Sequence, residues 1–417
     1  MIKNSFKIND YISLILKDGK VNILIEGKEF MLCKGIAIKM PVEDILEIQN
    51  FNSVDDLIAT YDKKVEGGKE HEEYIDLETE FMVHCSNLQA WSENGYDADL
   101  LHYNLAFPLL KKLSEVGDKR AKKVFKEAIL HRFVKGNKQV QVFLHANEYL
   151  SILTLEEQQV LYEKNIKEIH AIEKLTGNEI HVGSDLMLGD DIEVFDGEIT
   201  GLRLDGRKEI TIPEPISKIK SIKKLILHRF IDSKVPEWIG NLSNLEYLDL
   251  RSNEIVEIPK NIRKLKKLQH LNLGDNKLTK FPEELGNLIN LQTLFLGHNK
   301  LKILPRGILN LKNLRTIGLD YNVFEEFPKE LLTLKNIRGI SLLYNKIKEI
   351  PVEVLQLSEL YNFNIYGNPI KTLPYEILLL PKLEHILFPE VELKIPEYIK
   401  KKIKSHLRIY PNNLINE

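Results

Sequence analysis

The sequence predicts an α/β solenoid over residues 199–396, preceded by a mixed module of β-meander and helices. The first observation is a series of leucines at a constant interval of 23 residues: Leu242, Leu265, Leu288, Leu311, Leu334, Leu357 and Leu380. The second is a series of prolines at the same interval: Pro213, Pro236, Pro259, Pro282, Pro305, Pro328, Pro351 and Pro374. A fixed period of this length predicts stacked units, since one unit alone cannot bury its apolar face.

Alternation of apolar and polar residues within one unit predicts a short strand. Successive side chains of a strand point to opposite faces, so Leu248 and Leu250 should point inward and Tyr247, Asp249 and Arg251 outward. Stacking then makes a parallel sheet, whose outward side chains line the concave face. The segment after each proline should form a short helical turn on the convex face, because proline fits the first helical position.

An asparagine recurs where the chain leaves each strand. A carboxamide at this point can satisfy backbone groups that the turn leaves unpaired inside the solenoid. We therefore expect a structural ladder formed by Asn253, Asn276, Asn299, Asn322, Asn345 and Asn368.

The rest of the chain divides into four segments by its pattern. Residues 1–65 should form a small β-meander, with strands around 11–16, 21–25, 30–32 and 36–40, followed by a helix. Residues 71–177 show helical spacing, as in Ala121, Val124, Phe125 and Ala128, and predict a HEAT-like or bundle module. Residues 178–198 lose this spacing and form a connector. Residues 397–417 should form a C-terminal helical cap and tail.

Composition points to an intracellular protein without a polyanionic partner. The net charge of −3 indicates no basic stripe for binding nucleic acid. Two cysteines, Cys33 and Cys85, cannot build a disulfide framework, so we expect a reducing, cytoplasmic location. No apolar window is long enough for a membrane span. The pattern indicates no metal or other cofactor and does not fix an oligomeric state.

The repeat unit L-x-x-L-x-L-x-x-N-x-I/L-x-x-I/L/F-P resembles the leucine-rich repeat superfamily, and in particular the 23-residue class of Ras-suppressor-like and plant intracellular Ras-group proteins. This resemblance implies a protein-binding scaffold, with a small GTPase as one expected partner, and it implies no catalytic residue. The block from Glu80 to Trp91, continuing from Tyr96 to Leu110, resembles an uncharacterised module that precedes leucine-rich repeats in archaeal proteins.

The outward positions of the strands favour a protein-binding site on the concave face. Aromatic side chains on neighbouring strands about 5 Å apart should pool into one patch, and aromatics with arginine are typical of interface centres. The alternative is a solvated sheet face with scattered rings. The candidate binding residues are Tyr247, Asp249, Arg251, His270, Asn272, Phe295, His298, Asp320, Tyr321, Leu343, Tyr344 and Tyr366.

A catalytic interpretation of the N-terminal module rests on three residues. His84, Cys85 and His102 offer a thiol–histidine pair or part of a metal site, but the sequence brings no third ligand. A cysteine beside Phe81 and Leu88 is usually a small buried hydrophobe. We therefore expect a non-enzymatic, cytoplasmic signalling scaffold that binds a protein. The alternative is a regulatory or catalytic N-terminal domain that uses the repeats to recruit its substrate.

Overall fold

The computed structural model describes residues 5–32, 76–135, 138–183, 186, 191–389, 396, 400, 401, 403 and 407–410. Contacts divide the chain into two compact units: unit 1 comprises Met1–Glu163 and Phe195–Gly197, and unit 2 comprises Lys164–Val194 and Glu198–Glu417. The helical segment expected at 71–177 is thus divided between the units. Its last helix, α8 (Ile166–Thr176), packs against η5 (Glu214–Lys218), the first helical turn of the solenoid, and covers that end of its core.

Unit 1 begins with an antiparallel sheet in the order β1-β2-β3-β4. Its strands are β1 (Ser5–Lys7), β2 (Ile12–Lys17), β3 (Lys20–Ile25) and β4 (Lys28–Leu32). Three of them match expected strands, whereas β1 was not expected. Alternation buries Ile12, Leu14 and Ile23 on one face. The expected strand at 36–40 and the helix that follows it lie outside the described residues.

Helices make up most of the remaining part of unit 1 that the structure describes. They are α3 (Leu77–Glu93), η1 (Ala98–Leu100), α4 (Tyr103–Glu115), α5 (Lys119–Lys135), α6 (Lys138–Ala146), η2 (Tyr149–Ile152), α7 (Leu155–Gln159) and η3 (Val160–Asn165). Asp118 starts α5, because its carboxylate accepts the N–H groups of Arg120 and Ala121 at 2.8 and 3.0 Å. Phe107 and Phe133 are fully buried in the core that α4 and α5 share.

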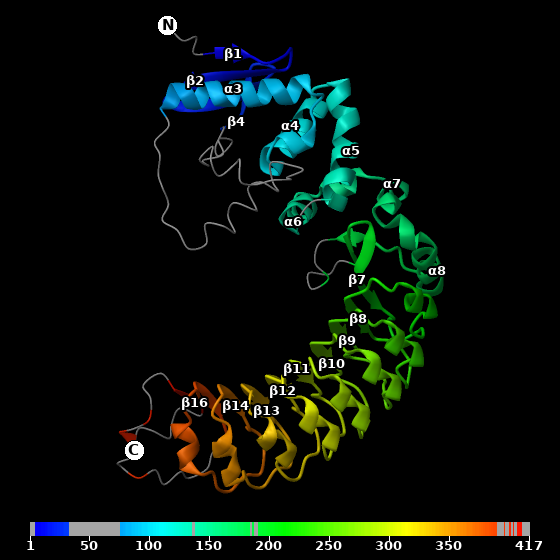
Figure 1. Cartoon of the computed structure of the whole chain (residues 1–417), viewed down its shortest axis with the longest axis vertical. Coiled ribbons are helices and arrows are strands. Elements are labelled where there is room, and N and C mark those ends of the chain that lie inside the picture. Colours follow the sequence, from blue (N-terminus) through cyan, green and yellow to red (C-terminus); the bar gives the residue numbers. More distant parts are fainter. Residues whose placement is uncertain are drawn as a thin grey trace. The chain divides into compact units, whose positions relative to one another are not determined.

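Unit 2 is a solenoid whose strands lie side by side (Figure 1). From β7 onward every successive pair is parallel. The strands are β5 (Val182–Gly183), β6 (Ile192–Phe195), β7 (Glu198–Asp205), β8 (Lys224–His228), β9 (Tyr247–Asp249), β10 (His270–Asn272), β11 (Thr293–Phe295), β12 (Thr316–Gly318), β13 (Gly339–Ser341), β14 (Asn362–Asn364), β15 (His385–Leu387) and β16 (Arg408–Tyr410).

The short helical turns are 3-10 helices on the other side of the solenoid (Figure 1). After η5 they are η6 (Glu237–Asn241), η7 (Lys260–Lys264), η8 (Glu283–Asn287), η9 (Arg306–Asn310), η10 (Lys329–Thr333), η11 (Val352–Gln356) and η12 (Tyr375–Leu379). Each follows a repeat proline directly. The parallel strands and short turns confirm the predicted repeat solenoid.

The end of the chain was expected to form a helical cap and tail. The described residues there include the strand β16, which extends the sheet by pairing Ile409 with Ile386 of β15. Ile409 is buried, so this strand covers the edge of β15 and part of the core. Most of the segment predicted as a helix, around 397–406, lies outside the described residues.

The recurring asparagines form a ladder inside the solenoid. Each is buried, with 5–8% of its surface exposed. Each carboxamide oxygen accepts a backbone N–H from the preceding unit, at 2.7–3.2 Å. In Asn299, the amide nitrogen donates to the carbonyl oxygens of Leu273, Leu296 and Gly297. The ladder therefore holds consecutive units in one register.

Candidate functional site: the concave face of the repeats

The concave face is built from equivalent positions that the sheet register aligns. His270 pairs with Tyr247 on one side and with Thr293 on the other, and Asn272 pairs with Phe295. Leucines between these positions are buried, so the flanking side chains are left on the face. An interval of 23 residues in the sequence thus becomes one step across the sheet.

A strained backbone position precedes each ladder asparagine. In successive units it is occupied by Ser252, Asp275, His298, Tyr321, Tyr344 and Gly367, and all have φ between 50° and 72°. Arg229, at the equivalent position before Phe230, has φ of 57°. Side chains other than glycine, asparagine and aspartate rarely adopt this conformation, since the Cβ atom crowds the backbone. Three consecutive units nevertheless place a large ring here, which costs roughly 1–3 kcal/mol at each position.

Together with the ring of Tyr366, these three rings form a continuous set that we call the aromatic row: His298, Tyr321, Tyr344 and Tyr366. The rings of His298 and Tyr321 stack with centroids 4.1 Å apart, and those of Tyr321 and Tyr344 at 4.7 Å. Tyr366 meets Tyr344 edge-on at 5.8 Å. The side chains of the three tyrosines remain 39–45% exposed. Mutual stacking orders the rings while these residues stay partly exposed to solvent.

Phe295 lies beside this row on strand β11. It is 43% exposed, although it is a large apolar residue. Its ring lies over Gly318 of the next strand, where an added Cβ atom would come within 2.8 Å of the ring carbon Cδ1. Glycine at this position therefore lets the ring lie flat on the sheet. Leu343, two strands away, is half-buried and adds apolar surface.

The other end of the concave face carries a polar network rather than rings alone. Asp249 is 3% exposed, although the alternation predicts that it points outward into solvent. Its neighbours cover it: Nδ2 of Asn272 donates to its carboxylate at 3.3 Å, and Nε2 of His228 lies 3.2 Å away. The backbone N–H of Arg251 also donates to it at 2.9 Å. Asp249 therefore lies beneath this surface and holds its neighbours in place through these contacts. The Arg251 side chain stays exposed.

The remaining candidates are divided between the two ends of the face. Tyr247 and His270 form a ring pair with centroids 5.8 Å apart, next to Asp249. Burial is the main cause that raises the pKa of Tyr247, and the charge of Asp249 raises it further. Asp320 lies at the aromatic end, where its carboxylate accepts the backbone N–H of Leu343 at 2.8 Å. The structure thus brings the predicted residues onto one face in two groups.

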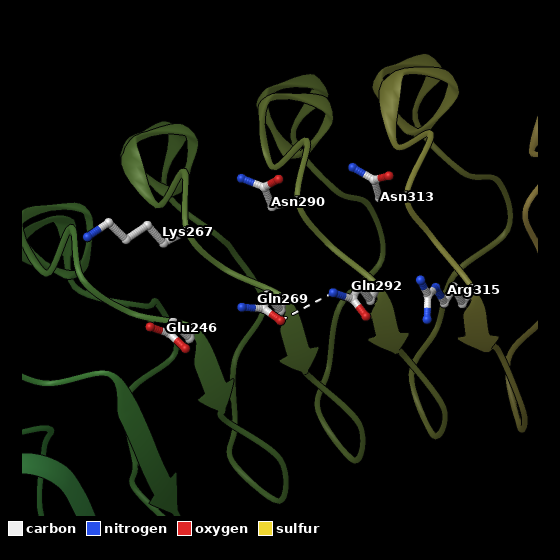
Figure 2. A pocket seen from close by; sticks show the side chains of 7 residues that line it. All are labelled: Glu246, Lys267, Gln269, Asn290, Gln292, Asn313 and Arg315. Atoms are coloured by element: carbon white, nitrogen blue, oxygen red, sulfur yellow. Dashed lines mark hydrogen bonds between the residues drawn. The ribbon is translucent and has the colours of Figure 1, made fainter. Parts of the chain in front are cut away.

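A polar hollow at the strand-entry edge was not found from the sequence. It measures about 420 Å³ and lies where the chain enters strands β9 to β12 (Figure 2). We call it the strand-entry groove, and its lining residues are Glu246, Lys267, Gln269, Asn290, Gln292, Asn313 and Arg315. Figure 2 shows them in two rows, one beside the strands and one beside the outer turns. The repeat of polar residues just before each strand was the signal in the sequence.

Asparagines of this edge also form a second, shorter ladder. Asn290 Nδ2 donates to the Lys266 carbonyl at 2.8 Å, and Asn313 Nδ2 donates to the Ile289 carbonyl at 2.9 Å. In the other row, Gln292 Nε2 donates to Gln269 Oε1 at 3.2 Å, drawn as the dashed line in Figure 2. The edge therefore presents amide groups at a regular spacing.

The three candidate catalytic residues of the N-terminal module, His84, Cys85 and His102, are either buried or cap a helix. Cys85 is 2% exposed, and burial raises the pKa of its thiol to about 11. His84 is fully buried, and burial lowers the pKa of its imidazole. The ring of His102 starts α4, with Nδ1 accepting the N–H of Asn104 at 3.3 Å. Within the described residues, no group of three or more His, Cys, Asp or Glu side chains is placed to hold a metal ion. Nor is any described helix both long and apolar enough to cross a membrane.

A comparison with known protein families matches part of the repeat solenoid. Residues 207–344 match the model of the leucine-rich repeat region. No curated protein matches the chain. A solved leucine-rich repeat protein from Leptospira interrogans is 30% identical over 52% of this chain and 64% of its own, with a TM-score of 0.37. An internalin, InlF, from Listeria monocytogenes is 19% identical over 50% of this chain and 66% of its own, with a TM-score of 0.40.

A third similar structure is the leucine-rich repeat ectodomain of the receptor kinase GASSHO1/SCHENGEN3 from Arabidopsis thaliana, solved with CASPARIAN STRIP INTEGRITY FACTOR 2. It is 22% identical over 48% of this chain and 31% of its own, with a TM-score of 0.40. This chain spans less than two thirds of each of these proteins. The family match agrees with the parallel strands, the 3-10 turns and the asparagine ladder. Residues 207–344 of this chain are therefore a leucine-rich repeat region.

Proposed function

We propose that this chain is a non-enzymatic interaction protein that binds a protein partner on the concave face of its repeats. The observation that carries the proposal is the aromatic row with Phe295 beside it. These rings are exposed, and His298, Tyr321 and Tyr344 sit in a backbone conformation that disfavours large side chains. Folding alone does not need rings at these positions, so their cost is best explained by binding.

The physical properties of this surface fit the centre of a protein interface. Tyrosine, phenylalanine and arginine are enriched at such centres, because they bury much area with few rotatable bonds. Stacking already orders the rings of Tyr321 and Tyr344, so a partner would not have to immobilise them on binding. The asparagine ladder beneath keeps their spacing fixed.

The catalytic alternative has less support. A thiol whose pKa is raised to about 11 carries little thiolate at neutral pH, which argues against Cys85 as a nucleophile. Elemental analysis of the purified full chain tests for a bound metal. An equimolar tightly bound metal, or a Cys85 thiol alkylated faster than a free cysteine, would favour the enzyme.

The binding proposal is tested by partner capture with the full chain and two matched double variants. Phe295→Ala with Tyr321→Ala removes two exposed rings of the concave face. The control, Ile303→Ala with Val352→Ala, removes two large apolar side chains that are 73% and 60% exposed elsewhere on the solenoid. We expect the first to weaken a captured partner by more than about 2 kcal/mol while the fold remains intact. A partner lost only with the control variant would contradict a concave binding site.

We further propose a cytoplasmic signalling role with a small GTPase as partner. Support comes from the resemblance of the repeats to Ras-suppressor-like proteins and, for the location, from the two cysteines. Binding of the full chain to a panel of purified GTPases, each loaded with GDP or a GTP analogue, tests the partner class. Absence of binding across the panel would contradict a small GTPase as the partner. It would not bear on whether the concave site binds another protein.

A further inference from the structure

The strand-entry edge of the middle repeats carries an unbalanced positive charge. Four equivalent segments, 265–270, 288–293, 311–316 and 334–339, contain no aspartate or glutamate. They contain six cations, which we call the basic edge: Lys266, Lys267, Lys312, Arg315, Lys335 and Arg338. All six side chains are exposed. The net charge of −3 for the whole chain conceals this local excess.

The register holds like charges next to one another. The backbone N–H of Arg338 donates to the carbonyl of Arg315 at 2.7 Å, so these two arginines occupy neighbouring rungs. Asn336 Nδ2 likewise donates to the carbonyl of Lys312 at 2.8 Å, which places the units of Lys312 and Lys335 side by side. Like charges on adjacent strands repel each other. The repulsion persists unless an anion lies over the edge.

In the part of the chain that the structure describes, the protein supplies no such anion within pairing distance of these cations. There, none of the six cations forms an ion pair with a carboxylate. Lys266 and Lys267 contact the uncharged Asn287 and Asn244, and Lys335 contacts Gln356. Arg315 and Arg338 keep guanidinium groups whose planar shape matches a carboxylate with two parallel hydrogen bonds.

The strand-entry groove adjoins these cations and shares Lys267 and Arg315 with them. Its Gln269, Gln292, Asn290 and Asn313 side chains carry donors and acceptors of the kind that pair with a peptide backbone. Cations beside a row of amide groups can bind a peptide ligand that offers both carboxylates and backbone amides. A bare phosphate or a single carboxylate would use only part of this surface.

We propose that the basic edge and the strand-entry groove bind an extended acidic peptide segment. The inference rests on the proposed function in one respect: the segment belongs to the protein that the concave face binds. Nucleic acid is less favoured, because none of the seven residues that line the groove is aromatic. Bases of single-stranded nucleic acid are held largely by stacking on aromatic rings.

The test measures binding of a fluorescent oligo-glutamate peptide to the purified full chain by anisotropy, at low and at physiological salt. The variant Arg315→Glu with Arg338→Glu should weaken binding about tenfold or more, since it replaces attraction by repulsion. The matched control, Lys300→Glu with Lys302→Glu, makes the same change in charge at two exposed lysines outside the basic edge. It should change the affinity less than about threefold.

Competition identifies the class of ligand. A single-stranded oligonucleotide of equal charge, or a vesicle containing phosphatidylserine, should bind more weakly than the peptide. The proposal is overturned if oligo-glutamate does not bind, if both charge variants weaken it equally, or if the oligonucleotide or the vesicle binds more tightly.

The two proposals fail in different ways. The Phe295→Ala, Tyr321→Ala variant should bind oligo-glutamate normally, because its changes lie outside the basic edge and the groove. Loss of the captured partner in that variant tests the concave site alone. Oligo-glutamate binding tests the edge alone and does not require the partner to be known.

Discussion

Replacing Asn299 with alanine should lower the free energy of unfolding by about 1–3 kcal/mol, the cost of one buried and unsatisfied polar group. Asn299 is 7% exposed. Its Oδ1 accepts the backbone N–H of Leu278 at 2.9 Å, and its Nδ2 donates to the carbonyls of Leu273, Leu296 and Gly297. The substitution removes all of these bonds.

The expected loss of stability is smaller than the summed contributions of these hydrogen bonds, because the three carbonyl groups keep other partners. Leu273 still accepts from Asn276, Leu296 still accepts from Asn322, and Gly297 still accepts from the N–H of Asp275. The N–H of Leu278 is different. Leu278 is fully buried, and Asn299 is the acceptor that the structure gives it.

Urea denaturation followed by circular dichroism measures the change. The control is Asn241→Ala, an exposed asparagine at the end of η6, which should shift the free energy of unfolding by less than about 0.5 kcal/mol. Asn272 is not a suitable control, since the structure makes it half-buried and bonded to Asp249. Equal effects for Asn299→Ala and Asn241→Ala would refute a structural role of the ladder.

Three further predictions concern stability. Gly367→Ala should cost about 1–3 kcal/mol, because φ is 72° and the added Cβ would approach Tyr344 Cδ1 to 2.5 Å; an unchanged urea midpoint would contradict this. The Cys85 thiol stays protonated in the folded chain at pH values where the unfolded chain ionises it. Stability should therefore fall as pH rises from 9.0 to about 11, and Cys85→Ala should remove that part of the fall. Truncation after Pro389 removes β16 and exposes the edge of β15, so aggregation is expected in light scattering; a stable monomer would contradict the capping role of β16.

The regular part of the solenoid could be predicted because its signal is periodic. The interval of 23 residues predicts that His270 lies beside Tyr247 and Thr293, and the sheet has this register. The position of Asn299 at the end of a strand likewise predicts a buried carboxamide, since a turn leaves backbone groups without partners. Both inferences need only the local pattern and the step between units.

Features that depend on particular neighbours could not be predicted in this way. Strict alternation points Asp249 into solvent, but His228 and Asn272 on adjacent strands cover it. Stacking of Tyr321 between His298 and Tyr344 follows from the left-handed backbone at each position, which no propensity of tyrosine indicates.

The segments that cover the two ends of the solenoid could be predicted only in part, for a related reason. Helix α8 and strand β16 cover the ends of the core, and neither lies in a full repeat unit. Their role is set by contacts with the first and last units rather than by their own spacing. Atypical end segments of this kind are expected in solenoids, but their form is not periodic.

Site-specific photocrosslinking tests the concave binding site most directly. Benzoylphenylalanine is introduced in place of Phe295 in one full-chain sample and in place of Val352 on η11 in another, and each is irradiated with the captured partner. The proposal predicts a covalent adduct from position 295, where the exposed ring lies on the concave face, and none from position 352. An adduct from position 352 with none from position 295 would contradict it.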